Sequence, residues 1–185
     1  MDHVIALWLP IIVSAVLVFV ASSVIHMVLG YHRNDYRKLP SEDAVMESLQ
    51  QHDLPPGDYM VPHISDPKVM EDPAFKAKME KGPLGFFTVV SDWAMGTSLL
   101  QWFVYCLVVS TFSGVLTSQA THETFYPGEV FHFAALISFA CYFLGLVQNS
   151  IWFKRSWKIT LKYLLDSVVY AAATGAAFMW LWPGG

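Results

Sequence analysis

The sequence has few charged residues: 14% of its 185 residues are Asp, Glu, Lys or Arg, whereas 55% are hydrophobic. A soluble domain usually carries about 25% charged residues. The net charge of -4 also argues against a nucleic-acid partner, because proteins that bind nucleic acids present clustered positive charge. The apolar residues are grouped in long runs with almost no charge, which predicts an integral membrane protein rather than a soluble domain.

Cysteine is scarce as well. The two cysteines, Cys106 and Cys141, both lie inside apolar runs, so they predict neither a disulfide framework nor a zinc-binding pattern. The sequence also lacks a phosphate-binding loop and a recognisable pairing of a nucleophile with a base. We therefore expect a non-enzymatic protein with no cofactor and no resident metal.

Four apolar runs are long enough to cross a bilayer as helices, which takes about 20 residues each. They cover residues 10–30, 91–117, 129–153 and 159–182. The N-terminus lacks the basic region of a signal peptide, so we expect the first run to be retained as a span. The prediction is an all-α integral membrane protein, a four-transmembrane-helix bundle with a short helical cytoplasmic segment. Its three parts are residues 1–30, with an outer tail and the first helix, residues 31–90, the cytoplasmic segment, and residues 91–185, with the other three helices and an outer C-terminus.

The basic residues are sorted between the loops. Seven of the eleven Lys and Arg residues lie between the first and second runs, and the other four lie between the third and fourth runs or just inside the fourth. The positive-inside rule places both of these loops in the cytoplasm and both termini outside. The location we expect is the cytoplasmic (inner) membrane of a bacterium, with a multi-pass topology.

The segment from 31 to 90 predicts two short helices, one capped by Ser41 and one capped by Asp72 with Pro73 at its first position. Residues 84–90 are interpreted as an interfacial stretch before the second span. The segment has too few apolar residues for a core of its own. We therefore expect it to contact a partner or the membrane face through exposed apolar side chains, and the candidates are Val45, Leu49, Phe75 and Met79.

A few polar residues lie inside the predicted spans, where they are costly and therefore candidates for function. They lie in the inner-leaflet third, and they are His26, Asp166, Asn149, Gln148 and Gln101. His26 is placed to hydrogen-bond Asp166 or Asn149. A purely structural alternative stays open, in which Lys162 pairs with Asp166 one helical turn away and His26 is a packing residue.

Histidines elsewhere suggest a third class of function, an intramembrane redox protein. Glu129 and His132 have the Glu-x-x-His spacing of a di-iron element, but such a site needs a second copy that the sequence lacks. His122 and Glu123 are close enough in sequence to complete a mononuclear site. His26 and His132 are predicted at opposite depths, which excludes a haem shared between them.

Two functions from different classes are therefore predicted. The first is a non-enzymatic accessory, assembly or interaction subunit of a cytoplasmic-membrane complex. The second is a small oligomeric transporter or proton-coupled channel that uses the inner-leaflet His, Asp and Asn cluster. The expected partners are the lipid bilayer and either another membrane protein or further copies of this chain.

Overall fold

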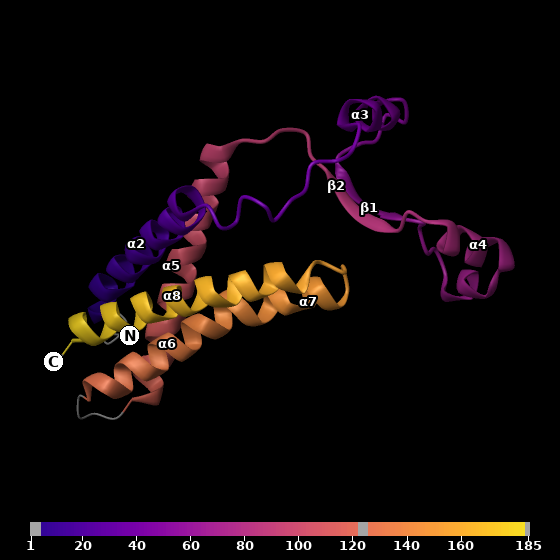
Figure 1. Ribbon diagram of the computed structural model, residues 1–185. Helices are drawn as coiled ribbons and strands as arrows, with labels where there is room; N and C mark the ends of the chain where they lie inside the picture. Colours follow the sequence, from indigo (N-terminus) through magenta and orange to yellow (C-terminus); the bar gives the residue numbers. More distant parts are fainter. Residues whose placement is uncertain (1–4, 122–125, 184–185) are drawn as a thin grey trace. The chain divides into compact units, whose positions relative to one another are not determined.

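The structure is a computed structural model that describes residues 5–121 and 126–183. The chain divides into two compact units (Figure 1). One unit consists of Met1–Tyr36 and Met95–Gly185, and the other is Arg37–Ala94. The first holds the long apolar helices, and the second holds the short elements between the first and second of them.

Four long helices build the first unit, and all four are long and apolar enough to cross a membrane. The first is α2 (Trp8–Ser23), which continues as the π-helix η1 (Val24–Leu29), and the second is α5 (Met95–Ala120). The third starts as α6 (Pro127–Phe143) and continues through a 3-10 turn, η3 (Leu144–Leu146), into α7 (Val147–Ile151). The fourth is α8 (Trp157–Leu181). The predicted helical bundle with four such helices is confirmed, and the helix ends differ from the predicted ones by only a few residues.

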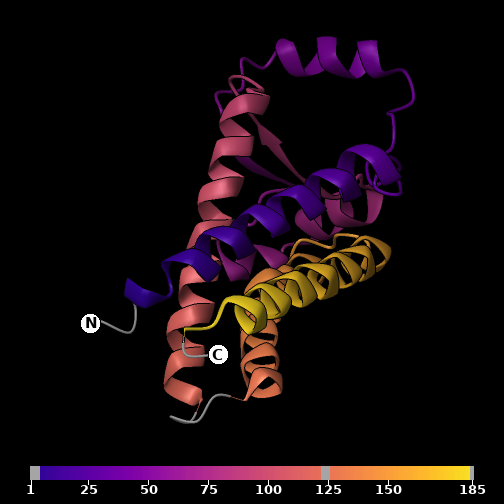
Figure 2. The ribbon, with the colours of Figure 1, turned by 90° about the vertical axis from the view of Figure 1, so that its left-hand side faces the viewer.

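The four helices form a closed ring of contacts. Helix α2 packs against α5 and α8, and α6 packs against the same two helices. The chain reverses direction between successive helices, so the start of α2 and the end of α8 lie at the same end of the bundle (Figure 2). We call this the apolar end. The opposite end, where η1 and α7 finish and where α5 and α8 begin, is called the basic end because the Lys and Arg residues follow or precede it.

Small residues allow the helices to approach one another closely. A Cβ atom on Gly175 of α8 would lie 2.9 Å from the backbone oxygen of Phe131 on α6, and one on Gly114 of α5 would lie 2.8 Å from the ring of Phe178. Inside a bilayer, close packing of this kind replaces the hydrophobic effect as the force between helices. Ser167 and Ala171 precede Gly175 at four-residue intervals and are also buried, so this face of small residues on the fourth span packs inward.

The second unit contains a two-stranded antiparallel sheet, which the sequence did not predict. Strand β1 (Gly57–Val61) pairs with β2 (Gly85–Val89), and Tyr59 lies opposite Phe87 with the ring centroids 5.2 Å apart. The stretch 84–90, which was interpreted as interfacial, therefore contains a strand, and its position at the membrane interface stays a prediction. Aromatic and β-branched residues favour a strand once a partner strand is present, but the partner here lies in a proline-bounded stretch far away in sequence.

The predicted short helices are both present in the second unit, as α3 (Glu42–Gln50) and α4 (Pro73–Lys81), with a further 3-10 turn, η2 (Pro67–Glu71), before α4. The predicted cap at Asp72 is confirmed, since its carboxylate accepts a hydrogen bond of 2.9 Å from the backbone N–H of Ala74. Ser41 precedes α3 as predicted, but its side chain makes no capping hydrogen bond, because its backbone is left-handed, with φ at 52°.

Candidate functional site

The first span ends in an unusual way. Its last turn and a half is the π-helix η1, which carries His26. π-helical segments are rare and frequently occur at functional sites. Gly30 follows with φ at 65°, the left-handed conformation with which glycine commonly ends a helix. Residues 31–36, which we call the return segment, then turn so that their side chains meet those of α8.

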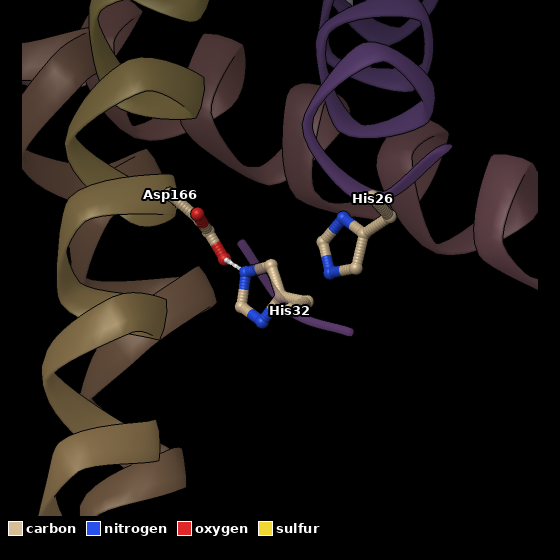
Figure 3. A group of neighbouring side chains, drawn as sticks. All are labelled: His26, His32 and Asp166. Atoms are coloured by element: carbon tan, nitrogen blue, oxygen red, sulfur yellow. Dashed lines mark hydrogen bonds and ion pairs between the residues drawn. The ribbon is translucent and has the colours of Figure 1, made fainter. Parts of the chain in front are cut away.

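His32 of the return segment connects two carboxylates. Its Nε2 atom lies 2.9 Å from Oδ2 of Asp166 on α8, and its Nδ1 atom lies 2.6 Å from Oδ2 of Asp35 (Figure 3 shows the bond to Asp166). The side chains of all three residues are at least nine-tenths buried. Each ring nitrogen therefore has a carboxylate partner, and the ring is fixed in orientation from both sides.

Lys162 holds the return segment against α8. Its ammonium group donates one hydrogen bond to the other oxygen of Asp35 and another, of 2.6 Å, to the backbone oxygen of Tyr31. Burial of Asp35 by itself favours the neutral carboxyl. The hydrogen bonds and positive charges of Lys162 and His32 outweigh that effect, so the pKa of Asp35 lies below its ordinary value.

His26 lies against the ring of His32. The two ring centroids are 4.4 Å apart and the rings are parallel within 4°. The Nδ1 atom of His26 donates a hydrogen bond of 3.0 Å to the backbone oxygen of Ser22, one helical turn earlier. The Nε2 atom of a neutral His26 ring is then left with its lone pair, because its proton is on Nδ1.

Asp166 has one oxygen that is not used. Its side chain is 1% exposed, yet Oδ1 has no hydrogen-bond partner among the described residues. A buried polar atom without a partner costs about 1–3 kcal/mol, and more where the group is charged. Such an atom is therefore a reason to look for something that binds there.

A cavity of about 740 Å³ lies in the bundle beside these residues. Three helices contribute an aromatic wall, namely α5 with Trp102 and Tyr105, α6 with Tyr142, and α8 with Tyr170. The centroids of neighbouring rings in this wall are 5.3–6.1 Å apart. The cavity is open to the outside, and two of its lining residues, Met27 and Met95, are 71% and 61% exposed.

The polar part of the cavity wall includes His26, Asp166 and Arg155. The guanidinium of Arg155 donates hydrogen bonds to the hydroxyls of Tyr36 (3.2 Å) and Tyr163 (3.4 Å). Its central carbon also lies over both of these rings, 5.6 and 5.4 Å from their centroids. Among the described residues, no carboxylate pairs with Arg155, so it places an uncompensated positive charge in the cavity wall.

The predicted polar cluster is present only in part. His26 and Asp166 are brought together, but through His32 and not by the direct hydrogen bond that was expected. The alternative pairing of Lys162 with Asp166 is not formed, because the return segment offers Lys162 a carboxylate and a carbonyl group together. Gln101 and Gln148 are exposed and Asn149 is half-buried, and no side-chain hydrogen bond joins these three residues to the cluster within the described chain.

The other predicted residues lie elsewhere. Glu129 is half-buried and His132 is exposed on α6, and His122 and Glu123 lie outside the described residues. In the second unit, Leu49 is 41% exposed, as expected of a contact residue, and Val45 and Met79 are half-buried. The expectation that Phe75 is exposed was wrong, since it is only 8% exposed and its ring packs inward from α4.

His32, Asp35 and Arg155 were not identified from the sequence. They stand in loops next to spans, where charged and polar residues are common and carry little information by themselves. The available signal was the spacing of His32 and Asp35, three residues apart directly after a span-ending glycine, because that spacing lets one tight turn join the two side chains.

No family model, curated protein or solved structure matches this chain. The candidate site is therefore argued from its own chemistry.

Proposed function

We propose that the bundle binds an amphiphile with an apolar body and an anionic head group. The cavity beside the polar cluster carries this proposal: it has about 740 Å³ of space, an aromatic and aliphatic wall, and one basic residue without a carboxylate partner. Pockets that bind small molecules are typically of this size and kind, mostly apolar with a few convergent polar groups.

The head group would bind at Arg155. A guanidinium recognises carboxylate and phosphate groups through paired hydrogen bonds. Arg155 is already oriented by the hydroxyls and rings of Tyr36 and Tyr163, so little side-chain entropy is lost when it binds an anion. The apolar body would lie along Trp102, Tyr105 and Met27.

The proposal favours the predicted transport function over the accessory one, because binding within the bundle is the first step of moving an amphiphile. The oligomeric state of such a transporter and the accessory role of the second unit both stay predictions. The orientation is also part of the proposal: the sorting of Lys and Arg supports a position of the basic end, and with it the head-group site, at the cytoplasmic face of a bacterial inner membrane. Anionic lipids are attracted to basic groups at that level of a membrane.

The test uses a fatty acid labelled with bromine, which quenches the fluorescence of a tryptophan that it touches. Purified protein in detergent is titrated with bromine-labelled stearate and, separately, with its uncharged methyl ester. We expect saturable quenching by the acid, weaker binding of the ester, and loss of most of the quenching in Trp102→Phe. Arg155→Gln should weaken binding of the acid by about tenfold, as expected for the loss of a hydrogen bond to a charged group.

The matched control is Lys158→Gln, which removes a basic residue that is exposed on the first turn of α8 and does not line the cavity. Equal binding of acid and ester would show that the head group is not recognised by charge. Absence of saturable quenching would show that the cavity does not bind this class of molecule.

A further inference from the structure

Three groups capable of binding a metal converge at the polar end of the cavity. They come from three different segments: His26 from η1, His32 from the return segment and Asp166 from α8 (Figure 3). One nitrogen from each histidine and one carboxylate oxygen all lie within 4.8 Å of one another. We propose that these three residues form a binding site for a divalent transition-metal ion such as Zn²⁺. This inference goes beyond the amphiphile and does not depend on it.

The groups behind the two histidines favour this role. A histidine that binds a metal usually donates its other ring N–H to a carboxylate or a backbone carbonyl, which fixes the tautomer and the ring orientation. His26 donates from Nδ1 to the backbone oxygen of Ser22, and His32 donates from Nδ1 to Asp35. Asp35 is fixed in turn by Lys162. Each ring therefore presents its Nε2 atom to the shared site.

Asp166 supplies an independent observation. Its Oδ1 atom is buried and has no hydrogen-bond partner among the described residues, and its Oδ2 atom lies 2.9 Å from the Nε2 atom of His32. A metal ion bound by the carboxylate of Asp166 would compensate this buried group. The ion would also replace the proton that lies between Nε2 of His32 and Oδ2 of Asp166.

Two histidines and one carboxylate are a suitable ligand set for Zn²⁺, Fe²⁺ or Co²⁺. Three protein ligands leave at least one coordination position open. That position would face the cavity, because His26 and Asp166 both line it. Metal–ligand bonds of about 2.0–2.2 Å require one rearrangement. Two imidazoles bound to one ion through in-plane nitrogens cannot stay parallel and stacked, so the ring of His26 must turn out of its present stack with His32.

The test is direct metal binding by the purified full chain. Protein in detergent is stripped with a chelator and titrated with Co²⁺, and Zn²⁺ is counted by elemental analysis after reloading. We expect one ion per chain and visible absorption bands from Co²⁺ bound in a site of low symmetry. His26→Gln and His32→Gln should lose both signals, and Asp35→Asn should weaken binding by about 10–100-fold, as is usual for partners of metal ligands.

His132→Gln is the matched control, because it removes an exposed histidine from α6, away from the cluster. Its metal content and spectrum should equal those of the unmodified chain. The proposal would be overturned by substoichiometric binding, or by binding that persists in His26→Gln and His32→Gln. X-ray absorption of the unmodified Zn²⁺-loaded chain gives a test that needs no variant, since a coordination shell without two imidazoles contradicts the site.

Discussion

The two ends of the helical bundle are built differently. At the apolar end, Leu7, Val130, Ala134 and Phe178 form a buried cluster in which no side chain carries a polar atom. At the basic end, a chain of polar contacts runs from Lys162 through Asp35 and His32 to Asp166, and an open cavity lies beside it. The apolar end is stabilised by the packing of side chains, whereas the basic end is stabilised by hydrogen bonds beside a cavity.

This difference indicates that the apolar end contributes mainly to the stability of the bundle, whereas the basic end contributes mainly to binding. Dense packing leaves no room for a ligand, but it fixes the helices relative to one another. A hydrogen-bonded cluster next to a cavity contributes less packing, yet it places charged groups where a ligand can reach them. We therefore expect substitutions at the apolar end to change the free energy of unfolding, and substitutions at the basic end to change local structure and binding.

The largest effect is expected for Phe178→Ala. The ring is fully buried, and its atoms fill the space that the missing Cβ of Gly114 leaves open. Removal of a buried Phe costs roughly 3–5 kcal/mol in soluble proteins. We expect the lower part of that range here, because between helices in lipid only the packing contribution is lost. Equilibrium unfolding in mixtures of mild detergent and dodecyl sulfate, followed by circular dichroism, measures this loss in the free energy of unfolding.

The control is Trp180→Ala, two residues further along the same helix, where the side chain is 77% exposed. It should lower the free energy of unfolding far less than Phe178→Ala does. Equal losses in the two variants would mean that the apolar end is not stabilised by its packing, and the contrast between the ends would fail.

The sequence was informative about the helices because the physical requirement for them is simple. A run such as residues 159–182 must bury its backbone polar groups in lipid, and only a helix achieves that within one segment. The hairpin was not predictable in the same way. Its strand β2 depends on pairing with β1, and nothing in either short stretch identifies the other as its partner.

A smaller and more local effect is expected for Lys162→Met. The substitution keeps the length of the side chain but removes the donor that binds Asp35 and Tyr31. Hydrogen bonds to charged groups contribute about 1.5–3 kcal/mol. Lys162 is 27% exposed, so the lower part of that range is expected. Hydrogen exchange followed by mass spectrometry should show faster exchange in residues 31–36, with α6 unchanged.

Lys158→Met is the matched control, since Lys158 lies one helical turn earlier on α8, is exposed, and is not among the hydrogen-bond partners of the return segment in the described chain. It should leave the exchange of residues 31–36 as it was. Faster exchange in both variants would point to a general effect of charge at the basic end rather than to the bond with Asp35.

The sequence predicted those site residues that are of an unusual type for their position in the chain. His26 and Asp166 stand out because ionisable groups are rare inside spans. His32 and Asp35 follow a glycine at the end of a span, where polar residues are ordinary. Their role depends on contacts with α8, more than a hundred residues further along the chain, that only the fold creates. Depth in the membrane was used to group the residues, but depth does not specify on which side of a helix a residue lies.

Gln101 shows this limit, and it gives the smallest expected effect. It was assigned to the polar cluster by its depth, but it is exposed on α5, whereas its neighbour Trp102 lines the cavity and donates a hydrogen bond of 2.7 Å to Ser22. Gln101→Leu should change the free energy of unfolding by less than about 0.5 kcal/mol and leave fatty-acid and metal binding unaltered. A loss of binding in this variant would mean that the exposed face of α5 meets another copy of the chain, as the oligomeric transporter requires. In that case the difference between the two ends would belong to the assembly rather than to one bundle.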